Sequence, residues 1–274
     1  MQRIENAQEA LHNKRYKEVL VELLYQLADD DFILSFRGSE WLGLAPHIEE
    51  DVAFSSISQN TMGHAYIYYQ LLSDLGEGNV DDLAHGRPPG VRKNAVLLEE
   101  ENGTGTYLDE PRFDWAFTVV RNYFYEVYKK MKLELLKQSS YVPLQHAAEN
   151  ILKEQYYHLM HWDTWFRQLV QAGGEARERM EKAIERVWDE FGGVLSYGPL
   201  GEEMVDFGLI EKEDVLRKKW LTFMEELFHS LGMKKFDEPK MKKGNGRAGE
   251  HIEDLTKALQ TLSEVYNVNP SAQW

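Results

Sequence analysis

The sequence predicts an all-α protein built around a four-helix bundle, and three observations lead to this prediction. Long segments carry apolar residues at the 3.6-residue spacing of a helix, and no segment shows the alternating pattern of a convincing strand. Proline and glycine gather in a few short stretches between these segments. Two aromatic-rich segments each hold a pair of polar residues four positions apart, a spacing that puts both members on one helix face.

The elements follow in order along the chain. We expect a short helix at about 3–12, then long helices at about 15–43, 48–75, 111–138, 143–172, 175–195, 212–231 and 249–266. The first two long helices join through a short turn at Pro46, and the next two join around 139–141, so each pair should be antiparallel. A long connection at about 76–110 separates the two pairs.

Two helical hairpins joined by one long crossover have the connectivity of a ferritin-like bundle. We therefore predict a single ferritin-like domain over residues 1–274, with the core bundle at about 15–172 and additional C-terminal helices at about 175–266. A basic, glycine-rich loop at 240–249 is expected to be either a mobile connector or a contact for an anion, on an acidic partner or on a CoA phosphate.

Composition excludes several classes of function. Hydrophobic residues make up 43% of the 274 residues and aromatics 12%, enough for a large packed core. The net charge of −15 argues against nucleic-acid binding, which needs clustered lysine and arginine. The absence of cysteine excludes disulfides and thiolate sites. No apolar segment has the length of a signal or membrane span, so we expect a cytoplasmic protein with no membrane partner.

The two polar pairs are Asn60 with His64 and Glu154 with His158. A polar pair on each of two packed helices resembles the bundles that hold two metal ions between carboxylates and histidines. The working motif is Glu-x-x-His, whereas the spacing here is i,i+4 and one glutamate position carries an asparagine. This pattern predicts a di-metal bundle whose metal site is degenerate.

Counting residues from each turn adds two acids at the same height. His64 lies level with about residue 28, where Asp29 and Asp30 are the acidic candidates, and Glu154 lies level with Glu126. The alternatives are hydrogen-bonded core or surface pairs and, for Glu126, a solvated helix face. The three consecutive acids at 29–31 cannot all point inward, so at least one should be at the surface. We predict a vestigial or uncertain metal site comprising Asp29, Asn60, His64, Glu126, Glu154 and His158.

Three blocks of sequence resemble a known family. The first contains L-x-D, I-L-x-x-R, S-E-W, A-P and E-x-D, carried by Leu27, Asp29, Ile33, Leu34, Arg37, Ser39, Glu40, Trp41, Ala45, Pro46, Glu49 and Asp51. The second is K-E-x-x-Y-H, carried by Lys153, Glu154, Tyr157 and His158. The third is the closing segment 246–274, which ends in Q-W. Together they resemble the C subunits of phenylacetyl-CoA epoxidase, the PaaC family of phenylacetic acid degradation proteins.

The resemblance implies a fold and a set of partners. The family is ferritin-like, and its C subunit binds tightly to a homologous A subunit that carries the working di-iron centre. A small B subunit and a reductase using NADPH complete an enzyme that epoxidises the aromatic ring of phenylacetyl-CoA with O₂. The C subunit is a structural partner with no cofactor of its own. This chain departs from the family at His64, where the family carries glutamine, and at Asn60, where it carries aspartate.

Two other functions stay open at this point. The chain could be an autonomous di-iron oxidase or oxygenase that uses its own bundle site, or a ferritin-like binding protein unrelated to oxygen chemistry; residual metal binding is compatible with each. Apolar residues in 65–72 and 158–169 exceed what one inward stripe needs, which predicts a homodimer or hetero-oligomer. The alternative is that the C-terminal helices of the same chain cover one of these faces.

Overall fold

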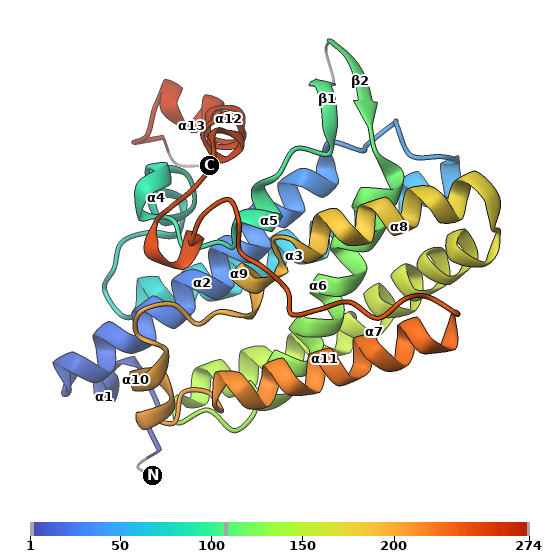
Figure 1. The fold of residues 1–274 in the computed structure, drawn as a ribbon. Coiled ribbons are helices and arrows are strands. Elements are labelled where there is room, and N and C mark those ends of the chain that lie inside the picture. Colours follow the sequence, from blue (N-terminus) through green and yellow to red (C-terminus); the bar gives the residue numbers. More distant parts are fainter. Residues whose placement is uncertain (1–2, 107–108, 273–274) are drawn as a thin grey trace.

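The computed structural model describes residues 3–106 and 109–272, and nearly all of its regular structure is helical (Figure 1). The main helices are α2 (Lys14–Ser39), α3 (Ile48–Asp74), α6 (Trp115–Leu136), α7 (Val142–Gln171), α8 (Gly174–Trp188) and α11 (Glu213–Ser230). Shorter helices are α1 (Ala7–Leu11), α4 (Val80–His85), η1 (Pro89–Val91), α5 (Val96–Glu99), α9 (Phe191–Leu195), α10 (Gly201–Asp206), η2 (Gly246–Ala248), α12 (Glu253–Leu262) and α13 (Glu264–Val268). The strands are β1 (Gly103–Thr106) and β2 (Asp109–Phe113).

The predicted bundle is confirmed. α2 packs along α3, α6 packs along α7, and contacts between α3 and α7 join the two hairpins. Side chains at the helix starts satisfy free backbone amides, as when Asn13 accepts from the Tyr16 amide and Asp114 from the Phe117 amide. The long crossover between the hairpins places all four helices around one interior, which is ferritin-like.

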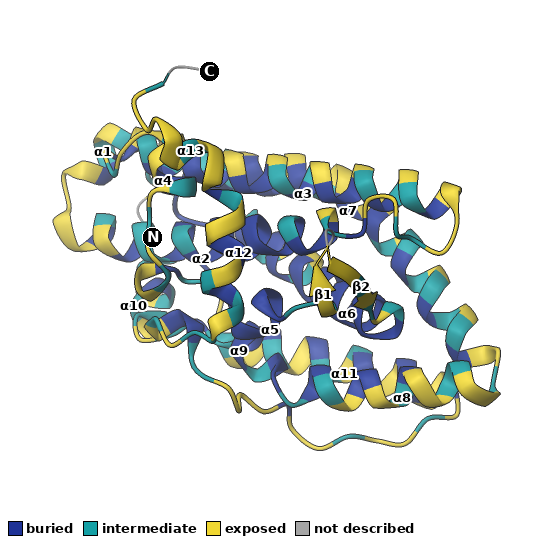
Figure 2. Cartoon of the chain, turned by 90° about the horizontal axis from the view of Figure 1, so that it is seen from above, coloured by how far each residue is buried: buried dark blue, intermediate teal, exposed yellow. Residues whose placement is uncertain are grey.

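The connection between the hairpins contains structure that the helical periodicity did not reveal. β1 and β2 form an antiparallel ribbon in which Gly103 pairs with Phe113 and Thr104 with Arg112. The ribbon projects from the bundle and is largely exposed (Figures 1 and 2). Residues 111–113, predicted as helix, are therefore strand, because α6 begins only after the capping residue Asp114. Two predicted C-terminal helices are also divided, 175–195 into α8 and α9, and 249–266 into α12 and α13.

Three of the C-terminal helices, α8, α9 and α11, cover α6, whereas α12 packs against α2 and α5. An aromatic cluster joins α8, α9 and α11, with Phe191 stacked on Trp220 at 4.1 Å between ring centroids and Trp188 stacked on Trp220 at 5.3 Å. Phe124 of α6 meets Trp220 edge-on at 6.1 Å. α6 is consequently buried around most of its circumference (Figure 2). In the part of the chain that the structure describes, no helix is long and apolar enough to cross a membrane.

Candidate functional site

Three consecutive aspartates, 29–31, lie at the middle of α2, and all three are buried. The expectation that at least one would be at the surface is wrong. Successive residues on a helix point about 100° apart, and here each carboxylate meets its own cationic partner contributed by another segment. A buried carboxylate is tolerated when it is paired and hydrogen-bonded.

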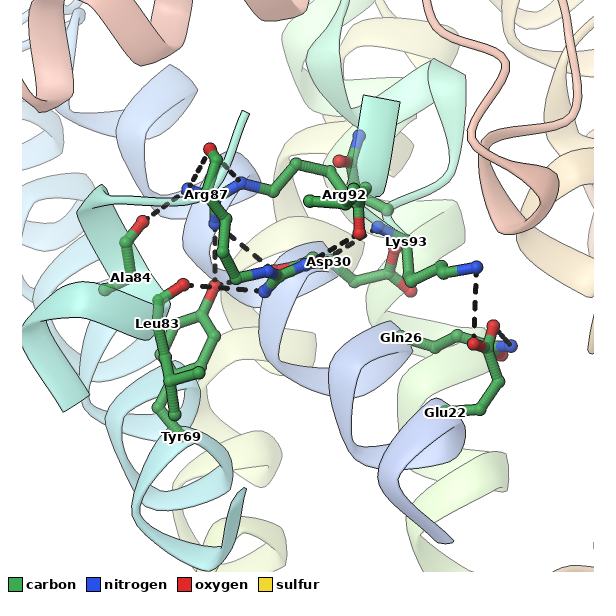
Figure 3. Close-up of polar contacts among 12 residues, drawn as sticks. Glu22, Gln26, Asp30, Tyr69, Leu83, Ala84, Arg87, Arg92 and Lys93 are labelled. Atoms are coloured by element: carbon green, nitrogen blue, oxygen red, sulfur yellow. Dashed lines mark hydrogen bonds and ion pairs between the residues drawn. The ribbon is translucent and has the colours of Figure 1, made fainter. Parts of the chain in front are cut away.

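Asp29 faces the crossover segment and not the other predicted site residues. Its carboxylate accepts from Arg87 at 2.7 and 2.9 Å, from the Tyr69 hydroxyl at 2.7 Å and from the Lys93 backbone amide at 2.8 Å. Arg92 lies 3.4 Å away. Figure 3 shows Arg87, Arg92 and Lys93 gathered beside this part of α2, with Tyr69 reaching in from α3. Burial raises the pKa of Asp29, but the two guanidinium groups and the hydrogen bonds outweigh it and hold that pKa at about 2.

Asp30 is bound by the C-terminal part of the chain. Arg247 of η2 forms a two-bond contact with it at 2.8 and 2.8 Å, and the Ala95 amide donates to it at 2.9 Å. Arg247 is completely buried. Arg247 of the loop at 240–249 thus binds a carboxylate of this same chain, which is neither the mobile connector nor the contact to an acidic partner or a CoA phosphate that had been expected.

Asp31 points into the space between the four long helices, where Asp29 had been expected. Lys129 of α6 donates to both of its oxygens, at 2.7 and 2.8 Å, and the Tyr125 hydroxyl donates at 3.0 Å. Burial raises the pKa of Asp31 to about 6 although Lys129 acts to lower it. Asp31 and Lys129 are 1% and 5% exposed, so this ion pair lies in the interior.

A chain of hydrogen bonds leads from this ion pair to the surface. The Lys129 ammonium donates to Nδ1 of His64 at 3.0 Å, and the opposite ring nitrogen, Nε2, lies 2.8 Å from Glu154. Since Nδ1 accepts, Nε2 carries the proton and donates to the carboxylate. Burial, together with the nearby Lys129 and His158, pushes the pKa of His64 far below its ordinary value, so the ring stays neutral. The Glu154 side chain is 49% exposed and forms the outer end of this chain.

The second histidine lies beside the first. The rings of His64 and His158 are 5.8 Å apart between centroids. Nε2 of His158 lies 3.4 Å from the Asn60 amide nitrogen, and Nδ1 faces Glu126 at 3.6 Å. Gln155 donates to the Glu126 carboxylate and to its backbone carbonyl. Although burial raises the pKa of Glu126, its contacts with His158, Lys129 and Gln155 lower it overall.

We call these contacts the polar centre, which consists of Asp31, Asn60, His64, Glu126, Lys129, Glu154, Gln155 and His158. It contains five of the six predicted site residues, and Asp29 lies outside it. Sequence reasoning missed Asp31, Lys129 and Gln155. Gln155 carried a usable signal, because it lies three residues before His158, the Glu-to-His spacing of the di-metal motif.

The residues of the polar centre do not fit a di-metal centre. The motif needs a carboxylate three residues before each histidine, and these positions hold Thr61 and Gln155. The Thr61 hydroxyl donates to the Ile57 carbonyl of its own helix. The Lys129 ammonium, held within 3.0 Å of both Asp31 and His64, brings a positive charge to the atoms that would ligate a cation. Within residues 3–106 and 109–272, no group of three or more acidic or histidine side chains is arranged to hold a metal ion.

This protein is thus a ferritin-like bundle in which a lysine occupies the polar interior. Comparison with known proteins is more specific. A family model described as "Phenylacetic acid catabolic protein" matches residues 1–274, and the chain belongs to that family. It is similar to the C subunit of 1,2-phenylacetyl-CoA epoxidase from Escherichia coli (strain K12), with 26% identity over 252 residues, covering 91% of this chain and 96% of that relative. The family resemblance seen in the sequence is confirmed.

Proposed function

We propose that this chain is a structural, non-catalytic subunit of a multicomponent phenylacetyl-CoA epoxidase, where it supports a homologous A subunit that carries the di-iron centre. Its family and its similarity to a C subunit over nearly its full length support membership of such a complex. The observation that carries the non-catalytic role is the position of Lys129, whose ammonium bridges Asp31 and His64.

Charge balance supports the same role. A di-iron site for oxygen activation is built from four carboxylates and two histidines. Here the two motif carboxylates are replaced by the neutral Thr61 and Gln155. Asp31 is already paired with Lys129, and Glu126 is held by Gln155. Glu126 Oε1, Gln155 Oε1 and His158 Nδ1 have no hydrogen-bond partner among the described residues, but the remaining acids already have partners within the chain. We therefore expect no metal in this subunit.

The competing function is an autonomous di-metal oxygenase. It would require Lys129 to give up its three hydrogen bonds to Asp31 and His64, while both motif positions still lack a carboxylate, so we do not favour it. A cytoplasmic complex with the A subunit, rather than a free-standing enzyme, is the state in which we expect the chain to act.

Reconstitution tests the proposal. The chain is purified alone and with the A subunit of the same organism, then supplied with iron, the reductase and the B subunit, NADPH and phenylacetyl-CoA. We expect epoxide only when the A subunit is present, and a much lower rate when this chain is omitted. Steady product formation by the iron-loaded chain with a reductant and no A subunit would overturn the non-catalytic role. Full activity of the A subunit without this chain would overturn the supporting role.

A further inference from the structure

An open apolar groove of about 530 Å³ lies on the surface between α7 and α11, with α6 as its floor. None of the residues that line it belongs to the polar centre. Tyr123, Val127 and Met131 of the floor recur every four residues, so they form one stripe along α6.

The two walls repeat the same spacing. Tyr156 and Met160 face the groove from α7, and Lys219 and Phe223 face it from α11, each pair four residues apart. Three helices thus each line the groove with side chains at helical spacing. A groove of this kind is the usual site for a further packed helix. The floor is lined from residue 123 to residue 134, which at 1.5 Å per residue is about 16 Å, or about three helical turns.

Large aromatic and apolar side chains on the α7 wall are exposed to solvent. Tyr156 is 64% exposed and Met160 is 53% exposed, and Tyr157 beside them is 64% exposed although it does not line the groove. Of the apolar residues in 65–72 and 158–169 that had suggested a partner surface, Tyr66 and Met160 are exposed. Several others are buried inside the chain instead, namely Tyr68, Tyr69, Leu72, Trp162 and Phe166. Aromatic and methionine side chains left exposed together mark protein interfaces, and a patch wider than the groove favours a macromolecule over a small ligand.

Charge at the rim specifies the occupant further. Of the two acids there, Asp163 is paired with Arg167 at 2.9 Å, and Glu134 is paired with Lys137. Lys130 and Lys219 are both exposed and make no ion pair or side-chain hydrogen bond with the described residues. The lining of the groove therefore combines an apolar stripe with two lysines, one on α6 and one on α11, that make no ion pair with the described residues.

We propose that this groove receives an amphipathic helix of the A subunit, with a stripe of large apolar side chains about three turns long and carboxylates along its edges. The inference rests on the proposed function, since it names the surface through which that partnership forms. The apolar stripe fills the trough over α6, while the carboxylates meet Lys130 and Lys219 at the rim. Such charge complementarity orients a helix that apolar packing alone would leave free to slide.

The test measures the affinity of the A subunit for the full-length chain and its variants. Met160→Glu places a negative charge inside the groove, and Lys219→Glu reverses the charge of its rim. Both residues are exposed, so the variants should fold, which circular dichroism and thermal unfolding will verify. Val52→Glu is the matched control, because Val52 is 61% exposed on α3 and lies outside the groove.

We expect Met160→Glu and Lys219→Glu each to raise the Kd at least tenfold, and Val52→Glu to leave it within twofold. Folded groove variants that bind the A subunit as tightly as the wild-type chain would overturn the inference and leave the proposed function intact. A wild-type chain that does not bind the A subunit at all would overturn both. Self-association of the chain that Met160→Glu abolishes would assign the groove to a second copy and overturn the proposed occupant.

Discussion

Replacing Lys129 by methionine removes the charge that compensates the buried Asp31 and leaves a side chain of similar length. Asp31 is 1% exposed and loses two hydrogen bonds of 2.7 and 2.8 Å, retaining the one from Tyr125. Breaking a buried pair by removing one partner costs about 3–5 kcal/mol. Protonation of Asp31 reduces this figure, so we expect the free energy of unfolding at pH 7 to fall by about 2–3 kcal/mol, measured by urea denaturation.

Protonation of Asp31 limits this loss and gives it a pH dependence. Keeping the carboxyl neutral at pH 7 against an unfolded pKa near 3.9 costs about 4 kcal/mol, at about 1.36 kcal/mol per pH unit. The folded pKa in the wild type is already raised to about 6, so the wild type bears about 3 kcal/mol of this cost and protonation limits the further loss from the charge to about 1.4 kcal/mol at pH 7. Between the unfolded pKa and the higher folded pKa, the folded state holds the proton that the unfolded state has lost. The free energy of unfolding therefore falls as pH rises through this range. Without Lys129 that window extends upward, so the deficit of the variant should be larger at pH 8 than at pH 5.

Two further variants separate the charge from the packing. Lys130→Met changes the exposed neighbour of Lys129 and should alter stability by less than about 0.5 kcal/mol. Lys129→Met combined with Asp31→Asn removes both charges and should recover at least half of the loss. A single variant Lys129→Met within about 1 kcal/mol of the wild type, or a deficit that does not change between pH 5 and pH 8, would refute the reasoning.

Two other substitutions probe neighbouring contacts. Arg247→Ala leaves the buried Asp30 without its two-bond partner, so we expect a loss of about 3–5 kcal/mol in urea unfolding and faster limited proteolysis after residue 230; an unchanged proteolysis rate would contradict this role. Glu154→Ala removes the acceptor of the His64 proton, but Glu154 is half exposed and water can replace it, so we expect a loss of about 1 kcal/mol or less. A loss above 3 kcal/mol would show that Glu154 belongs to the interior.

The helical periodicity and the turn residues were sufficient to predict the four long helices and their connectivity. They could not reveal the β1–β2 ribbon, because a short exposed ribbon has no apolar face from which an alternating pattern could arise. The divided C-terminal helices were missed for a related reason. We predicted one helix at 175–195 because the apolar spacing continues across the break at 189–190. In the structure α9 begins after this break and packs against α11.

The height argument found the correct level in the bundle but the wrong acid on α2. Asp29 and Asp31 are two residues apart, which is about 200° around a helix. Counting from a turn fixes height to within a few residues and gives no information about which side chain faces inward. The orientation of each aspartate depends on contacts with segments far away in the sequence. Arg87 and Arg92 come from the crossover and Arg247 from near the C-terminus, and no spacing rule connects them to α2.

Gln155 shows what a stricter reading of the sequence could have found. The i,i+4 spacing of Glu154 and His158 was treated as a damaged Glu-x-x-His motif, whereas the intact i,i+3 position holds glutamine. In the structure Gln155 is completely buried and binds Glu126, and Glu154 turns to the surface. The motif is present with its carboxylate replaced by an amide. Lys129 could not have been anticipated, because a lysine among aromatic residues of α6 also reads as an ordinary surface position.

We propose that the Lys129 ammonium, and not a metal, keeps the polar centre folded. The most direct test is anomalous scattering at the iron edge from crystals of this chain in complex with its A subunit, grown with iron present. The account predicts iron peaks within the A subunit, and continuous density for Lys129 between Asp31 and His64 in this chain. An iron peak within ligand distance of His64, His158 and Glu126, with Lys129 displaced, would contradict it.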